Sequence, residues 1–140
     1  MSDSFSDLLP DVELKEPASA SLLESMQMKA GGALPPAFIN IFRLSNGLAG
    51  PVNKNAYIIL WTIEEVIENN EDYTTREFLP GIFLIGSDGG EIAYGLDLRT
   101  PGNTYQQFLA VPFMDMDWNE VQFLGSTFSD FLSKLKDGIF

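Results

Sequence analysis

The sequence contains no cysteine and no histidine. Without cysteine the chain has no disulfide, no thiol nucleophile and no thiolate metal site. Without histidine it lacks the commonest general base and the commonest transition-metal ligand. Ser-His-Asp and Cys-His catalytic devices are therefore excluded. The enzyme classes that remain use paired carboxylates, a lysine base or a hard cation held by carboxylates.

Long hydrophobic runs are also missing. The longest, Ala56 to Trp61, is far shorter than the roughly 20 residues of a membrane-spanning helix. The first seven residues are acidic and polar, whereas a secretion signal has a basic start and an apolar stretch. We therefore expect a soluble, cytoplasmic protein with no membrane partner.

Positive charge is scarce. Eight Lys and Arg side chains oppose 20 Asp and Glu side chains, which gives a net charge of -12 and a pI near 4.1. Such a field repels nucleic acids and anionic lipids and attracts basic proteins. We therefore expect a protein partner and no nucleic-acid partner. The simpler alternative is that the acidity only keeps a small protein in solution.

The 140 residues, 45% of them hydrophobic, are enough for one domain with one substantial core. Apolar spacing predicts helices over residues 19–29, 34–46, 62–69 and 127–136, and strands over 56–61, 82–85, 91–97 and 108–113. Residues 48–55 are predicted to be a loop, and 115–124 to be irregular. The continuous apolar character of 56–61 predicts a strand that is covered on both faces.

This order of elements predicts a single α+β domain. Its sheet is expected to be mixed or mostly antiparallel and flanked by helices, with an amphipathic helix at the C-terminus. Residues 1–18, which two prolines interrupt, are predicted to form an N-terminal extension, and residues 19–140 the domain.

Two motifs resemble known ligand-binding loops. Gly86 to Gly90 suggests a phosphate cradle, but such loops lead into a helix and need a lysine, and here a strand follows. We predict a hairpin turn instead. Asp115 to Asn119 resembles the start of a calcium loop, yet Glu120 stands where glycine is needed and Ser126 where glutamate is needed. We predict a solvated acidic loop, no metal and no cofactor.

Capping boxes are predicted at Thr62 with Glu65 and at Thr127 with Asp130. The helix that begins at Thr62 is rich in glutamate, and a solvated face is its default interpretation. The alternative is a docking surface for a basic partner. The partner-binding candidates are the acidic residues of this helix and of the predicted loops, with one aromatic residue among them: Glu64, Glu65, Glu68, Glu71, Asp72, Asp88, Glu91, Asp115, Asp117 and Trp118.

Five motifs in order resemble the SUKH superfamily, over roughly residues 22–135. They are Leu34-Pro35-Pro36 with Ser45-Asn46-Gly47, Leu60 to Asn69, Pro80 to Gly90, Tyr94 to Asp97, and Ser126 to Leu132. Glu91 departs from the family, which often continues its glycine run there. The residues assigned to the family's structural motifs are Pro35, Asn46, Gly47, Trp61, Pro80, Gly81, Gly86, Gly89, Gly90, Asp97, Phe128 and Phe131.

The resemblance implies a domain without catalysis and without a cofactor. Many bacterial members look like immunity proteins that neutralise a toxin, often a nuclease, and eukaryotic members serve as regulatory scaffolds. The leading hypothesis is an immunity protein that occludes a basic toxin domain. A regulatory scaffold without a toxin is the second hypothesis, and a hydrolase with a carboxylate-bound cation is the third.

Overall fold

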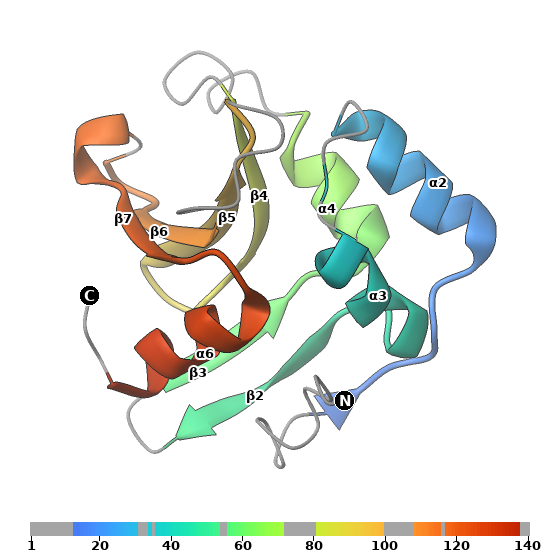
Figure 1. Cartoon of the computed structure of the whole chain (residues 1–140), viewed down its shortest axis with the longest axis horizontal. Coiled ribbons are helices and arrows are strands. Elements are labelled where there is room, and N and C mark those ends of the chain that lie inside the picture. The colour runs from blue at the N-terminus through green and yellow to red at the C-terminus, as the bar shows by residue number, and fades with distance from the viewer. Residues whose placement is uncertain are drawn as a thin grey trace.

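A computed structural model describes residues 13–30, 34, 36–53, 56–71, 81–99, 108–115 and 117–137. In these residues, four α-helices accompany a seven-stranded sheet (Figure 1). The strands lie in the order of the sequence, and each pairs with the next in antiparallel orientation. The predicted α+β domain with a mostly antiparallel sheet is confirmed.

The helices occupy the positions that the apolar spacing predicts. They are α2 (Ala20–Lys29), α3 (Pro36–Leu44), α4 (Ile63–Asn69) and the C-terminal α6 (Phe128–Asp137), with a short 3-10 turn, η1 (Trp118–Glu120). The strands are β1 (Glu13–Leu14), β2 (Leu48–Asn53), β3 (Ala56–Leu60), β4 (Ile82–Ser87), β5 (Ile92–Asp97), β6 (Phe108–Pro112) and β7 (Gln122–Gly125).

Three strands lie where the sequence predicts none. The short β1 belongs to the predicted N-terminal extension, and it pairs with β2. The predicted loop over 48–55 is wrong for β2, which pairs with β3 from Leu48 to Asn53. Gly50 and Pro51 weaken the local preference for a strand, but pairing with β3 overrides it. The irregular stretch 115–124 likewise contains η1 and the start of β7, which pairs with β6.

The prediction that β3 is covered on both faces is also wrong. Ile58 and Leu60 are fully buried, whereas Tyr57 is exposed and Ile59 is only partly buried. Alternate residues of a strand face opposite sides of its sheet. The helix-covered side therefore buries one face of β3, while the other face is open at Tyr57.

Two apolar clusters result from this alternation. The larger cluster joins the helices to one face of the sheet, and its centre is aromatic: the ring centroids of Phe108 and Phe131 are 5.2 Å apart, and those of Tyr94 and Phe131 are 5.1 Å apart. The smaller cluster contains Leu84 and Leu109, with Ala93 and Val111. The half-buried Trp61 packs against both clusters.

The segment Ser45-Asn46-Gly47 ties three parts of the fold together. The buried Ser45 hydroxyl accepts a hydrogen bond from the Lys15 amide at 2.7 Å and donates one to the Gly47 carbonyl. The Asn46 Oδ1 accepts from the Ile63 amide at 2.8 Å, at the start of α4. Gly47 has φ +87°, and a β-carbon there would lie 2.8 Å from the Leu60 carbonyl oxygen, so this position requires glycine.

Polar side chains begin α4 and α6. The predicted capping box of α4 is confirmed, because the Thr62 side chain accepts from the Glu65 amide while the Glu65 carboxylate accepts from the Thr62 amide. At α6, the Thr127 hydroxyl accepts from the Asp130 amide at 3.0 Å. These side chains satisfy amide groups that lack partners within a helix's first turn.

The Asn70 side chain bonds the backbone of β4 beyond the positions at which β3 pairs with it. The pairing of β3 with β4 is limited to Ile59 with Ser87 and Leu60 with Gly86. Beyond it, the Asn70 side chain bonds both backbone groups of Leu84: Oδ1 accepts from the Leu84 amide at 2.8 Å, and Nδ2 donates to the Leu84 carbonyl at 2.8 Å. The same Nδ2 donates to the Val66 carbonyl at 2.7 Å. The end of α4 is thereby fixed to β4.

Candidate partner-binding surface

The predicted partner-binding residues belong to three separate places. Four of them, Glu64, Glu65, Glu68 and Glu71, form what we call the α4 group. The sheet-end group consists of Asp88, Glu91 and Asp115, and Asp117 and Trp118 lie at η1. Asp72 lies outside the described residues. In Figure 1, α4 lies beside α2, on the other side of β4 from β6 and β7.

The α4 group is exposed, but several of its carboxylates have partners within the chain. Glu65 caps its own helix, and Glu71 forms an ion pair with Lys29 at 3.4 Å. The Glu64 carboxylate accepts from Asn46 Nδ2 at 3.1 Å. This hydrogen bond lowers the pKa of Glu64 below its ordinary value, so the side chain is ionised at neutral pH. Part of the charge on α4 therefore serves the fold.

The sheet-end group gathers at the turn between β4 and β5. The predicted hairpin is confirmed, although Gly86 and Ser87 belong to β4 and the turn itself spans residues 88–91. The Asp88 carboxylate holds the turn by accepting from the Gly90 amide at 2.8 Å and the Ile92 amide at 3.1 Å. The Glu91 side chain remains exposed.

The end of β6 lies directly beside this turn. The Phe113 amide donates to the Glu91 carbonyl at 2.8 Å, which extends the pairing of β5 with β6 by one position. The Asp115 amide then donates to the Pro112 carbonyl at 3.2 Å. Asp88, Glu91 and Asp115 come from two connections that are distant in sequence, and the fold brings them to one end of the sheet.

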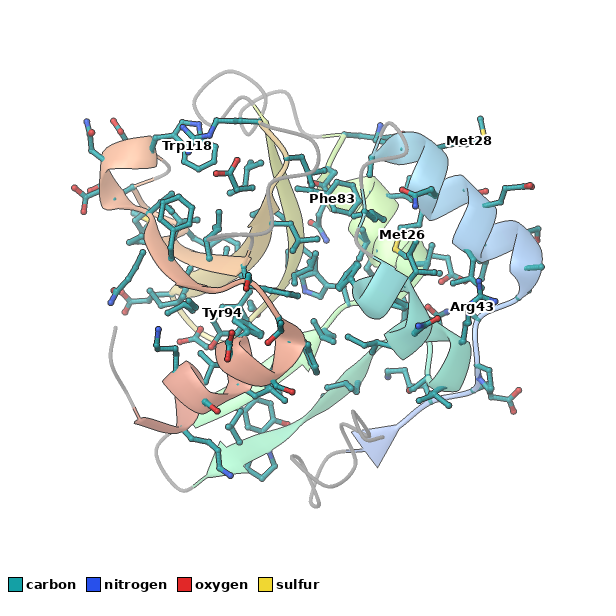
Figure 2. The ribbon with its side chains drawn as sticks, in the orientation of Figure 1. Met26, Met28, Arg43, Phe83, Tyr94 and Trp118 are labelled. Atoms are coloured by element: carbon teal, nitrogen blue, oxygen red, sulfur yellow. The ribbon has the colours of Figure 1, made fainter. Side chains whose placement is uncertain are left out.

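Trp118 is held by a cation rather than projecting freely. The Arg99 Cζ lies 3.5 Å from the centre of the Trp118 ring, and this ring also packs against the smaller apolar cluster. The Arg99 guanidinium donates to the buried Asp97 carboxylate through Nε at 3.1 Å and through a terminal nitrogen at 3.0 Å. Figure 2 shows Trp118 at the edge of the domain, apart from Tyr94 in the core.

These bonds make a chain from β5 to η1. Hydrogen bonds from Arg99 to Asp97 raise the pKa of the guanidinium above its ordinary value, so the charge over the indole ring is permanent. Arg99 is not among the residues that the sequence predicts to bind a partner. The spacing of Asp97 and Arg99 is a usable signal, because the two side chains pair across one intervening residue.

A group of exposed apolar side chains is also absent from the predicted partner-binding residues. Tyr57, Phe113 and Met114 are all exposed, and all three lie near the β4–β5 turn. The consecutive Phe113 and Met114, between Pro112 and Asp115, are the signal in the sequence. An apolar pair directly before an acidic loop is unusual for a solvated connection.

The residues assigned to family motifs lie mainly at turns and close contacts. Gly81 and Gly89 have positive φ angles, and a β-carbon at Gly86 would collide with the Ile59 carbonyl oxygen. Gly90 lies in the β4–β5 turn, and its amide bonds Asp88. Phe128 and Phe131 lie in the larger cluster. Pro35 and Pro80 lie outside the described residues.

Two further observations limit the chemistry of the described residues. No group of three or more acidic side chains in the described ranges is arranged to hold a metal ion. No helix there is long and apolar enough to cross a membrane.

A family model described as SMI1 / KNR4 family (SUKH-1) matches residues 17–134, which is most of the chain. No curated protein matches the sequence.

Proposed function

Because the chain belongs to the SMI1 / KNR4 family (SUKH-1), we propose that it is a non-enzymatic immunity protein of the cytoplasm. It binds and neutralises a toxin domain, and its acidic surface receives the basic surface of that toxin. Family membership supports a protein-binding role in general. The observation that carries the toxin-specific proposal is the net charge of -12.

Electrostatics gives the proposal its mechanism. A nuclease toxin carries a basic surface that binds phosphates. Carboxylates on the immunity protein attract that surface at long range and occupy the place of the phosphates. Segments 87–93 and 112–121, which carry the sheet-end group and η1, contain no lysine or arginine. Their own residues supply no positive charge, and the Arg99 guanidinium over the Trp118 ring is paired with Asp97.

The second candidate function is a regulatory scaffold without a toxin partner. One observation favours it: Glu64, Glu65 and Glu71 are engaged by Asn46, the α4 cap and Lys29. In that case the acidity serves folding and solubility. The scaffold binds its partners with little dependence on salt, whereas charge-driven toxin binding weakens as salt screens the charges.

The test begins with the full chain, affinity-tagged, in lysate of its source organism at low and at high salt. We expect one basic, nuclease-like protein, bound in stoichiometric amount and released by salt. The purified partner is then assayed for nuclease activity, and an equimolar amount of this chain is expected to abolish it. Recovery of several signalling or cell-wall proteins, or of no stoichiometric partner, contradicts the immunity function.

Charge reversal then locates the electrostatic surface. Glu91→Lys with Asp115→Lys changes the sheet-end group, and Glu68→Lys with Glu71→Lys changes the α4 group. Reversal of the group that faces the toxin is expected to slow association at low salt by at least tenfold, with a smaller effect at high salt. Unchanged association at low salt for both pairs sinks the assignment of binding to these carboxylates.

A further inference from the structure

Large apolar side chains are exposed at five described positions. Two lie on helices: Met28 on α2 is 76% exposed and Leu44 on α3 is 60% exposed. The other three are Tyr57 at 44%, Phe113 at 38% and Met114 at 89%. All three of these lie near the β4–β5 turn, although they come from β3 and from the end of β6.

The sheet register places Tyr57 and Phe113 on the same face. Ile59, Ser87, Ala93 and Val111 pair in one row across the sheet from β3 to β6. Tyr57 precedes Ile59 by two residues in β3, and Phe113 follows Val111 by two residues and continues the pairing of β6 with β5. Because every second residue of a strand faces the same side, the Tyr57 and Phe113 side chains point to the same side as those of Ile59 and Val111. Three strand spacings separate them, or about 14 Å.

The β4–β5 turn fills the space between these two side chains. A β-carbon on Gly89 would lie 3.8 Å from Tyr57 Cδ2, so the Tyr57 ring borders the turn on one side. The Phe113 amide bonds the Glu91 carbonyl on the other side. Gly89 and Gly90 have no side chains, so this part of the turn presents only backbone beside the Tyr57 ring. Met114 follows Phe113 and is the most exposed of the three.

We propose that Tyr57, Phe113 and Met114 form the apolar anchor of the partner-binding surface, with Asp88, Glu91 and Asp115 as its rim. The occupant is a protein surface that presents an apolar pocket or ridge surrounded by lysine and arginine. This inference rests on the proposed function for the need of a protein partner. It goes further in assigning the contact to the sheet end rather than to α4.

Charge complementarity selects this occupant. Asp88 and Glu91 lie in the turn that borders Tyr57 and Phe113, and Asp115 follows Met114. The segments that carry these three carboxylates contain no cation. A second copy of the chain brings another net charge of -12 to the contact, and an anionic membrane also repels it. A basic protein satisfies both parts of the surface, because its charges meet the rim while its apolar residues bury the anchor.

The composition of the anchor suits protein recognition. Tyrosine and phenylalanine supply large contact areas with little conformational freedom to lose, and aromatic residues are enriched where binding energy concentrates. Methionine is flexible and adapts its shape to a partner. The carboxylates are then expected to speed association, and the apolar anchor to slow dissociation.

The test uses two synthetic peptides of equal length and charge. One alternates lysine with leucine, and the other alternates lysine with serine. Each is titrated into the full chain, with affinity measured by calorimetry and contacts mapped by amide NMR shifts. The lysine–leucine peptide is expected to bind at least tenfold more tightly. Its shifts are expected at Tyr57, in residues 88–92 and in residues 112–115.

Variants separate the anchor from other exposed apolar residues. Phe113→Ser with Met114→Ser is expected to weaken binding of the lysine–leucine peptide roughly tenfold, and Met114→Ser alone by a smaller factor. The matched controls Met28→Ser and Leu44→Ser remove comparably exposed residues and are expected to leave binding unchanged. Urea midpoints verify that each variant is folded, and Met114, at 89% exposure, is the safest site to change.

Three outcomes overturn the proposal: equal affinity for the two peptides, shifts confined to α4, or equal losses in the control variants. The result is independent of the toxin. If the lysate yields no basic partner while the peptide binds at the sheet end, the immunity function fails and the anchor stands. If a toxin is recovered but binds the serine variants normally, the anchor fails and the immunity function stands.

Discussion

The replacement of Asn70 by alanine tests how β4 is held to the helical part of the domain. The change removes three hydrogen bonds and leaves the amide and carbonyl of Leu84, a residue that is 3% exposed, without this partner. Each unsatisfied buried backbone group costs about 1–3 kcal/mol. For the two Leu84 groups the expected loss in the free energy of unfolding is therefore about 2–6 kcal/mol, a large share of the roughly 5–15 kcal/mol that stabilises a domain.

The assay is urea denaturation followed by the fluorescence of the two tryptophans. With a slope of about 2 kcal/mol per molar, the midpoint is expected to fall by roughly 1–3 M. Asn69→Ala is the matched control, because Asn69 is exposed and its amide donates to the Glu65 carbonyl of its own helix, at 2.8 Å. Its loss is expected to stay within about 0.5 kcal/mol.

A second variant separates the hydrogen bonds from packing. Asn70→Asp keeps the size of the side chain but replaces the Nδ2 donor with an oxygen that faces the Val66 and Leu84 carbonyls. It is expected to be at least as destabilising as alanine at neutral pH, because like partial charges then meet in a buried site. A loss below about 1 kcal/mol for Asn70→Ala, or an equal loss for Asn69→Ala, refutes the view that Asn70 substitutes for a strand.

Three further predictions concern charge. Arg99→Ala is expected to destabilise the fold by about 1–2 kcal/mol in urea titrations and to change the near-ultraviolet circular dichroism of Trp118. Arg99→Lys is expected to recover less than half of this lost stability, because lysine cannot donate two parallel hydrogen bonds to Asp97. Asn46→Ala is expected to raise the lowered pKa of Glu64 in an NMR titration; an unchanged value contradicts the assigned hydrogen bond. This carboxylate stabilises the fold above its unfolded-state pKa and loses that contribution as pH falls through its folded-state pKa. Burial, and to a lesser extent the charge of Asp88, raises the pKa of the Tyr94 hydroxyl, so the stability of the fold falls as pH rises above about 10. An absorbance titration is expected to show one of the four tyrosines ionising at higher pH than the others, and Tyr94→Phe is expected to remove that step.

Local chemistry predicted the helices well. Apolar spacing located α2, α3, α4 and α6, and the capping box placed the start of α4 at Thr62. These signals act within a few residues, so they survive in a single sequence. In contrast, β2 was missed because its strand character comes from β3 across the pair rather than from its own residues, which include Gly50 and Pro51.

The surface was predicted less completely, for a physical reason. Acidic residues are recognisable one by one, but their grouping depends on which connections the sheet brings together. The hydrogen bond from the Phe113 amide to the Glu91 carbonyl joins the end of β6 to the β4–β5 turn, and no local pattern in the sequence predicts this bond. For the same reason, the contact of Arg99 with Trp118 and the bonds of Asn70 to Leu84 emerged only in three dimensions.

The narrow pairing of β3 with β4 has a consequence for how the molecule opens. Strands β4 to β7 form one continuous meander, and β2 with β3 form a separate hairpin (Figure 1). The two units share only two paired positions, and residues 61–81 separate β3 from β4 in the chain. One more backbone bond, from the Trp61 amide to the Ile85 carbonyl, continues this pairing. Joining the two units closes a longer loop for fewer paired positions than any pairing within the meander. We therefore expect this seam to form late in folding and to part first in the native protein, so that amide hydrogens along it exchange with solvent before those of β5.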